Sequence, residues 1–180
     1  MKTIDELLSQ IANNTGATPP EPSVKEPTYK KEEKKTVKKQ ITGTRPYLTL
    51  ALAKEIIYCV EKGAENMGLN AVIAVVNADG RLVAFEAMDN SYLASISAAQ
   101  DKAYTAAALK MPTEKALAES RGGIFDGLSN GNGILLLGGG NPLFINGELV
   151  GAVGVSGGTK EQDIELSMLG VRYLEERLSL

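Results

Sequence analysis

The chain has 180 residues, of which 43% are hydrophobic, and it carries a formal net charge of −3. It contains one cysteine and no histidine, which excludes an internal disulfide framework, a multi-cysteine metal site and histidine-based catalysis within one chain. No stretch approaches the roughly 20 apolar residues of a membrane span. The start of the chain is acidic and has no apolar run typical of a signal peptide, so we expect a cytoplasmic protein.

Residues 1–16 have the pattern of a short amphipathic helix. A capping box opens it, and one face carries the apolar residues Ile4, Leu7, Leu8 and Ile11. A helix of about 12 residues is marginal by itself in water, so it needs a surface on which to dock. That surface is either the chain's own domain or a partner protein, and the long segment that follows favours a partner.

Residues 17–46 form the second part of the chain. They contain five prolines and eight Lys/Arg against four Glu, with a Lys/Glu run over 30–39. Low hydrophobicity and several prolines predict an extended, disordered tether. The interleaved glutamates indicate a solvated spacer rather than an arm that binds nucleic acid.

From Tyr47 to the end, the pattern is that of a globular domain. Ten basic residues stand against sixteen acidic ones, which argues against nucleic acid as a partner. Thr49 caps a predicted helix that ends at Gly68. The sequence then predicts a strand over 71–76, a turn at 77–80 and a return strand over 81–88, which together make a hairpin.

The remainder of this domain repeats the same kinds of element. An alanine-rich helix is predicted over 92–110, with a short helical turn after Thr113. A buried strand over 133–137 precedes a second hairpin, which turns at Asn146-Gly147 and continues over 148–155. A closing helix runs from 160 to about 178. Hairpin links imply antiparallel pairing, so we expect an α+β three-layer sandwich with about five antiparallel strands flanked by helices.

The segment 151–163 predicts a buried strand, a glycine turn and a helix start with a capping box. Such a turn directs free backbone N–H groups at one spot, which favours an anion; close packing is the competing interpretation. The segment also matches the G-x-S-x-G nucleophile elbow, but no histidine is available to activate the serine. We therefore predict a binding turn, not a catalytic one, made by Gly154, Ser156, Gly157, Gly158 and Thr159.

Polar residues gather in the middle of the predicted helix 92–110. Asp101 lies three residues before Tyr104 and four before Thr105, so the three share a face. We interpret them as lining a cavity near the glycine turn, with Lys102 available to a ligand carboxylate. Arg81 in the first hairpin is a further candidate for a carboxylate. The competing interpretation is an ordinary exposed surface with Tyr104 half-buried.

Several stretches of the domain resemble the GlcG/HbpS-like family, which includes the C-terminal domain of PduO-type proteins. The matching stretches are 71–84, 88–89, 101–106, 138–143 and 151–163. The resemblance implies a profilin-like sandwich that assembles into homo-oligomers from dimers to octamers. It also implies a bound tetrapyrrole, which is heme or, in PduO-like members, cobalamin. Some members have an axial histidine near the first hairpin, where this chain has Arg81, so Tyr, Met and Cys remain as protein ligands.

Residues 1–46 resemble the encapsulation peptides and linkers that carry cargo into bacterial microcompartments. The resemblance implies that residues 1–16 dock on a shell or cargo protein. Together the two resemblances imply a heme-binding accessory protein, without catalysis of its own, in a microcompartment lumen within the cytoplasm. Two alternatives stay open: a corrinoid-handling enzyme or factor in which Asp101, Lys102 or Tyr104 transfers protons, and a structural cargo protein that binds no ligand.

Overall fold

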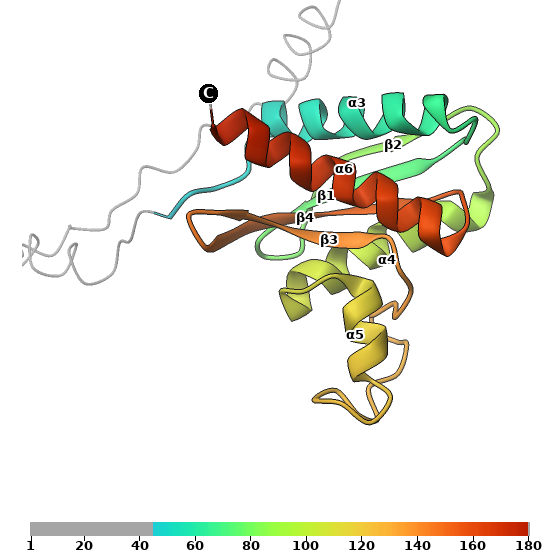
Figure 1. Cartoon of the computed structure of the whole chain (residues 1–180), viewed down its shortest axis with the longest axis vertical. Helices are drawn as coiled ribbons and strands as arrows, with labels where there is room; N and C mark the ends of the chain where they lie inside the picture. The colour runs from blue at the N-terminus through green and yellow to red at the C-terminus, as the bar shows by residue number, and fades with distance from the viewer. Residues whose placement is uncertain (1–44, 180) are drawn as a thin grey trace, which may run out of the picture. The chain divides into compact units, whose positions relative to one another are not determined.

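The computed structural model describes residues 45–179, so the predicted helix 1–16 and most of the predicted tether lie outside the described residues. Figure 1 shows the arrangement of the helices and strands. Their bounds are α3 (Leu50–Asn66), β1 (Val72–Asn77), β2 (Leu82–Ala87), α4 (Leu93–Leu109), α5 (Thr113–Glu119), β3 (Gly140–Ile145), β4 (Glu148–Ser156) and α6 (Lys160–Leu178).

The four strands form one antiparallel sheet in the order β2-β1-β4-β3. Both predicted hairpins are present. The β3–β4 turn places Asn146 at φ 51° and Gly147 at φ 79°, the left-handed conformations that favour an Asn-Gly pair in a two-residue hairpin loop. β1 and β4 are paired along their whole common length, from Val72 opposite Ser156 to Asn77 opposite Gly151.

Helices cover both faces of the sheet, so the domain has three layers (Figure 1). Alternate residues of β1 divide between two cores because successive side chains of a strand point to opposite faces. Ile73 and Val75 pack in the core beneath α3 and α6, whereas Ala74 and Val76 pack against α4. The predicted α+β three-layer sandwich is confirmed.

The core on the α4 side is built almost entirely from small residues. Its α4 members are four alanines, and β4 contributes Ala152 to it. Gly154 of β4 lies directly under α4, where a Cβ atom would collide with the backbone oxygen of Ala99 and the backbone nitrogen of Ala103. The backbone of α4 therefore packs directly on the backbone of β4, with no side chain between them at Gly154.

The sheet has four strands rather than the five predicted, because the segment 133–137 forms no strand. Its only ladder-like contact is an isolated bridge between Gly131 and Ile134. The backbone N–H of Leu135 instead donates to the Thr105 hydroxyl at 2.8 Å. The Thr105 side chain thus accepts the hydrogen bond that a neighbouring strand would otherwise accept. An apolar run in the sequence does not reveal this partner. Within residues 45–179, no helix is both long enough and apolar enough to span a membrane.

Candidate functional site

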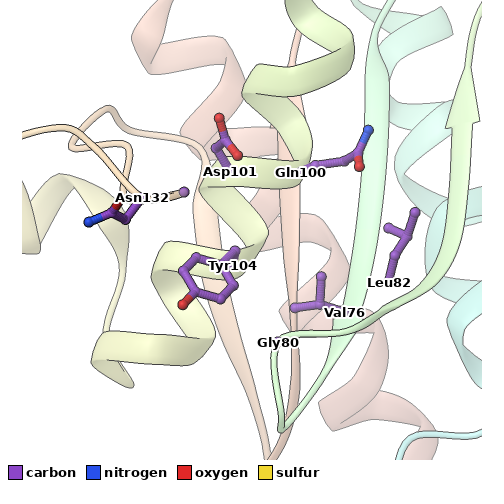
Figure 2. Close-up of a pocket in the computed structure, with 8 residues that line it drawn as sticks. Val76, Gly80, Leu82, Gln100, Asp101, Tyr104 and Asn132 are labelled. Atoms are coloured by element: carbon purple, nitrogen blue, oxygen red, sulfur yellow. The ribbon is translucent and has the colours of Figure 1, made fainter.

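A cavity of about 400 Å³ opens beside the turn between β1 and β2. We call it the hairpin pocket. Figure 2 shows that its walls come from the β1–β2 hairpin, from α4 and from the loop that carries Asn132. The lining residues are Val76, Gly80, Leu82, Gln100, Asp101, Tyr104, Asn132 and Gly133.

The ring of Tyr104 is held between two glycines from different loops. A Cβ atom at Gly80 would lie 2.8 Å from Cδ2 of the ring, and one at Gly133 would lie 3.2 Å from Cδ1. Both glycines have left-handed φ angles, of 76° and 82°, so each position favours glycine for its backbone as well as for the space. Tyr104 is 36% exposed, and the two loops fix its ring as one wall of the pocket.

Thr105 is fully buried and holds the loop across the pocket in place. Its hydroxyl donates to the backbone oxygen of Asp101 at 2.7 Å and accepts from the backbone N–H of Leu135 at 2.8 Å. The hydroxyl is thus engaged by the chain itself, and contact of Thr105 with a ligand stays a prediction. Thr105 positions the pocket wall.

Of the described residues that line the hairpin pocket, Asp101 alone is charged. Among the described residues, no lysine or arginine forms an ion pair with it. Gln100, Tyr104 and Asn132 add neutral hydrogen-bonding groups. Arg81 is exposed and lies between two lining residues without lining the pocket itself, so a role for it in binding stays a prediction.

Two backbone donors of the glycine turn are engaged by side chains of the same chain. The N–H of Gly158 donates to Oδ1 of Asp163 at 2.9 Å, and the N–H of Thr159 donates to Oε1 of Gln162 at 2.8 Å in the predicted capping box. The anion at this helix start is thus the Asp163 carboxylate. Two of the several backbone donors expected at this turn are therefore engaged by the chain itself, and the binding of an external anion by residues 154–159 stays a prediction.

Of the other predicted residues of this turn, Gly154 and Ser156 are buried and Gly157 is half-buried. The hydroxyl of Ser156 lies 3.3 Å from that of Ser95, on a residue that is 8% exposed. Gly154 is covered by α4, and a Cβ atom at Gly157 would lie 2.7 Å from the backbone oxygen of Asn70. Close packing, the competing interpretation, accounts for these positions.

Lys102 is fully buried and points away from the hairpin pocket into a charge network. Its Nζ donates to Oδ2 of Asp163 at 2.6 Å and to the backbone oxygen of Val155 at 2.9 Å. Burial lowers the pKa of the Lys102 ammonium, and the hydrogen bond with Asp163 opposes that shift. The chain itself supplies a carboxylate to Lys102, and the availability of Lys102 to a ligand carboxylate stays a prediction.

The predicted site therefore divides into two separate places. Val76 of the hairpin pocket pairs with Ala152, whereas Ser156 at the glycine turn pairs with Val72. Four residues of extended strand separate them, which is about 13 Å. Asp101 and Tyr104 line the pocket, and Lys102 belongs to the buried network under the glycine turn.

Two polar lining residues were not predicted from the sequence. Gln100 lies one helical turn before Tyr104, on the same face of the helix, so this spacing could have predicted it as a lining residue. Asn132 lies in the run Asn130-Gly-Asn-Gly133, which indicates a loop but not the element that the loop covers.

The described residues offer no cluster for a metal ion but do offer one possible ligand for heme iron. In residues 45–179, no group of three or more Cys, Asp and Glu side chains could hold a metal ion. Tyrosine is one of the protein ligands of heme iron, and Tyr104 is the lining residue of that type. The apolar part of the lining, with Val76 and Leu82, suits a macrocycle.

Comparison with known proteins gives one matching family. Residues 48–172 match the family model described as haem degrading protein HbpS-like. An uncharacterized 15.0 kDa protein of Citrobacter freundii, from the dhaT-dhaS intergenic region, is 39% identical over 119 residues, which are 64% of this chain and 84% of that protein. The crystal structure of a PduOC–heme complex superposes with a TM-score of 0.67 at 26% identity, covering 71% of this chain and 94% of the other.

The corrinoid adenosyltransferase PduO of Citrobacter freundii is also similar. It is 34% identical over 117 residues, which are 63% of this chain but 35% of PduO. The chain thus spans about a third of the length of that relative.

Proposed function

The chain belongs to the HbpS-like family, and we propose that its globular domain binds a tetrapyrrole, heme, in the hairpin pocket. The observation that carries this proposal is the pocket itself: a tyrosine clamped between two glycines, beside an apolar wall. A heme complex of a similarly folded protein at 26% identity supports the choice of ligand.

Each group of the pocket has a part in the proposed binding. The Tyr104 oxygen would be the iron ligand, and Gly80 and Gly133 fix the orientation of the tyrosine ring that carries it. Val76 and Leu82 would supply the apolar part of the wall for the porphyrin. When bound, heme would supply an iron centre; the protein's own contribution is to hold and orient it, as an accessory protein rather than an enzyme.

A hemin titration of the full chain, followed by absorbance, tests this function. We expect a saturable shift of the Soret band at about one hemin per subunit. Tyr104→Phe keeps the ring between the glycines but removes the oxygen ligand, so we expect an affinity loss of about tenfold or more and a changed spectrum. Tyr92→Phe, at an exposed position, is the control. If the wild type produces no Soret shift, the heme proposal is wrong; an unchanged Tyr104→Phe spectrum would reject Tyr104 as the ligand.

A corrinoid is the second candidate ligand, because the chain is similar to a third of a corrinoid adenosyltransferase. Cobalamin titrated in parallel distinguishes the two. A response to cobalamin and none to hemin would favour the corrinoid-handling function. No response to either would favour a structural cargo protein.

We also propose that residues 1–16, which lie outside the described residues, deliver the protein to the lumen of a bacterial microcompartment in the cytoplasm. The support is the sequence pattern: an apolar face with Leu7 and Ile11, followed by a long Pro/Lys/Glu segment. A docking helix of this kind lays its apolar face into a groove of a shell or cargo protein.

Residues 1–46 fused to a fluorescent protein and co-expressed with shell proteins test the targeting. We expect the wild-type fusion to concentrate in foci, and Leu7→Glu or Ile11→Glu to make the fluorescence diffuse by placing a charge on the apolar face. Ser9→Glu, on the opposite face, is the matched control and should keep the foci. Diffuse wild-type fluorescence, or foci that survive both apolar-face changes, would remove the targeting proposal.

Finally, we propose a homo-oligomer of two to eight subunits. The edge strand β2 exposes Leu82 by 49% and Phe85 by 37%, and Leu93 at the start of α4 is 83% exposed. Exposed apolar residues and unpaired strand edges of this kind are features of protein interfaces. Light scattering of the full chain measures the subunit number, and a monomer would contradict the proposal.

A further inference from the structure

The hairpin pocket has an electrostatic property that bears on which tetrapyrroles it admits. We propose that the pocket takes the macrocycle by an edge that bears no carboxylate, and that Asp101 is the specificity-determining residue that rejects a carboxylate at that edge. This inference rests on the proposed heme-binding function and names the class of ligand that the same site selects.

The first argument is the charge of the lining. Among the described lining residues Asp101 alone is charged, and it lies on the same face of α4 as Tyr104, three residues before it. A ligand bound against Tyr104 therefore lies along the helix face that also carries the Asp101 carboxylate. Two negative groups that come close to each other repel even in water.

The second argument is that no described cation neutralises Asp101. Lys102, its neighbour in the sequence, is turned into the opposite side of the helix and paired with Asp163 at 2.6 Å. No other described lysine or arginine forms an ion pair with Asp101. The carboxylate thus presents its charge to the pocket.

The third argument is the chemistry of the remaining walls. Val76 and Leu82 are apolar, while Gln100 and Asn132 are neutral amides, so the walls suit the methyl and vinyl groups of a porphyrin edge. The exposed side chain of Arg81, in the turn at the pocket's margin, lies outside the lining. Propionates that remain outside the pocket are therefore free of the Asp101 charge.

Two iron porphyrins that differ in the position of their propionates test whether the pocket rejects a carboxylate. Heme carries its two propionates on neighbouring pyrrole rings, so the opposite edge has no carboxylate. Ferric coproporphyrin I alternates methyl and propionate around the macrocycle, so it must bring a carboxylate into the pocket whichever edge enters. We expect the full-length wild type to bind hemin more tightly than ferric coproporphyrin I in absorbance titrations.

The decisive variant is Asp101→Asn, which keeps the shape of the side chain and removes its charge. We expect the ratio of hemin affinity to ferric coproporphyrin I affinity to fall by about fivefold, the effect of one charge–charge repulsion at about 4 Å in water. Asp101→Glu retains the charge and should retain most of the discrimination. Asp89→Asn makes the same change of net charge at an exposed position outside the pocket and should leave the ratio unchanged. Ferric coproporphyrin I lacks the vinyl groups of heme, and comparing the affinity ratio of the variant with that of the wild type cancels this difference.

A second measurement needs no variant. Raising the salt concentration from about 0.01 M to about 1 M shortens the Debye length from about 30 Å to about 3 Å, so the wild-type ratio should fall with salt. Hemin binding with a ratio that responds neither to Asp101→Asn nor to salt overturns the inference and leaves the heme function standing. Binding of neither porphyrin overturns the heme function itself.

Discussion

Replacing Lys102 by methionine should lower the free energy of unfolding by about 3–5 kcal/mol, the usual cost of removing one partner from a buried ion pair. The ammonium is fully buried, 2.6 Å from the Asp163 carboxylate. Methionine fills a similar volume but leaves that carboxylate without its counter-charge. The Val155 oxygen also loses a donor at 2.9 Å. The Gly158 N–H alone then remains as a donor to Asp163.

Urea unfolding of the wild type and the variant measures this loss. The double variant Lys102→Met/Asp163→Leu removes both charges and should recover most of the stability, because a buried pair replaced by apolar residues is often neutral. Lys160→Met is the control, since the Lys160–Glu161 pair is exposed at 3.6 Å and should contribute less than about 1 kcal/mol. A change below about 1 kcal/mol for Lys102→Met would show that the network does not stabilise the domain.

Gly154→Ala should be at least as damaging, although it adds a single methyl group. The new Cβ atom would meet the backbone of α4 at Ala99 and Ala103, and backbone atoms of a packed helix cannot rotate aside as a side chain can. Overpacking in a core typically costs 1–3 kcal/mol. Here α4 has to move off the sheet, so we expect a loss of about 3 kcal/mol or more, or a domain that fails to fold.

Thermal and urea unfolding, with far-UV circular dichroism as the signal, measure the effect of Gly154→Ala. Gly68→Ala is the matched control: it has a left-handed φ of 67° but nothing within 4 Å of the added atom, so it should cost about 1–2 kcal/mol from backbone strain alone. Equal losses for the two variants would contradict the idea that α4 rests on Gly154.

Local sequence patterns were sufficient for most of the elements. The Thr49 side chain caps α3, and the predicted capping box at Thr159 is present at the start of α6. The Asn146-Gly147 turn joins β3 and β4 as expected. Caps, two-residue turns and apolar periodicity involve residues a few positions apart, so their energetics are already present in the sequence.

The tertiary structure decided what each polar residue does. Asp101, Lys102 and Thr105 lie within five positions of one helix, yet one lines the hairpin pocket, one pairs with Asp163 and one holds the loop at Leu135. These outcomes depend on partners 30 to 61 residues away in the chain.

The difference between local patterns and distant partners also explains the two places where the structure departs most from the sequence-based expectation. The apolar segment 133–137 resembles a strand, but its donor at Leu135 bonds to a helix side chain. The glycine turn resembles an anion site, but the anion is Asp163 of the same chain. The sequence by itself determined the elements and the family of the fold, because these depend on local spacing and on ordered motifs. Only the tertiary structure decided which donors and charges remain for a ligand, since each is consumed or left free by residues distant in the sequence.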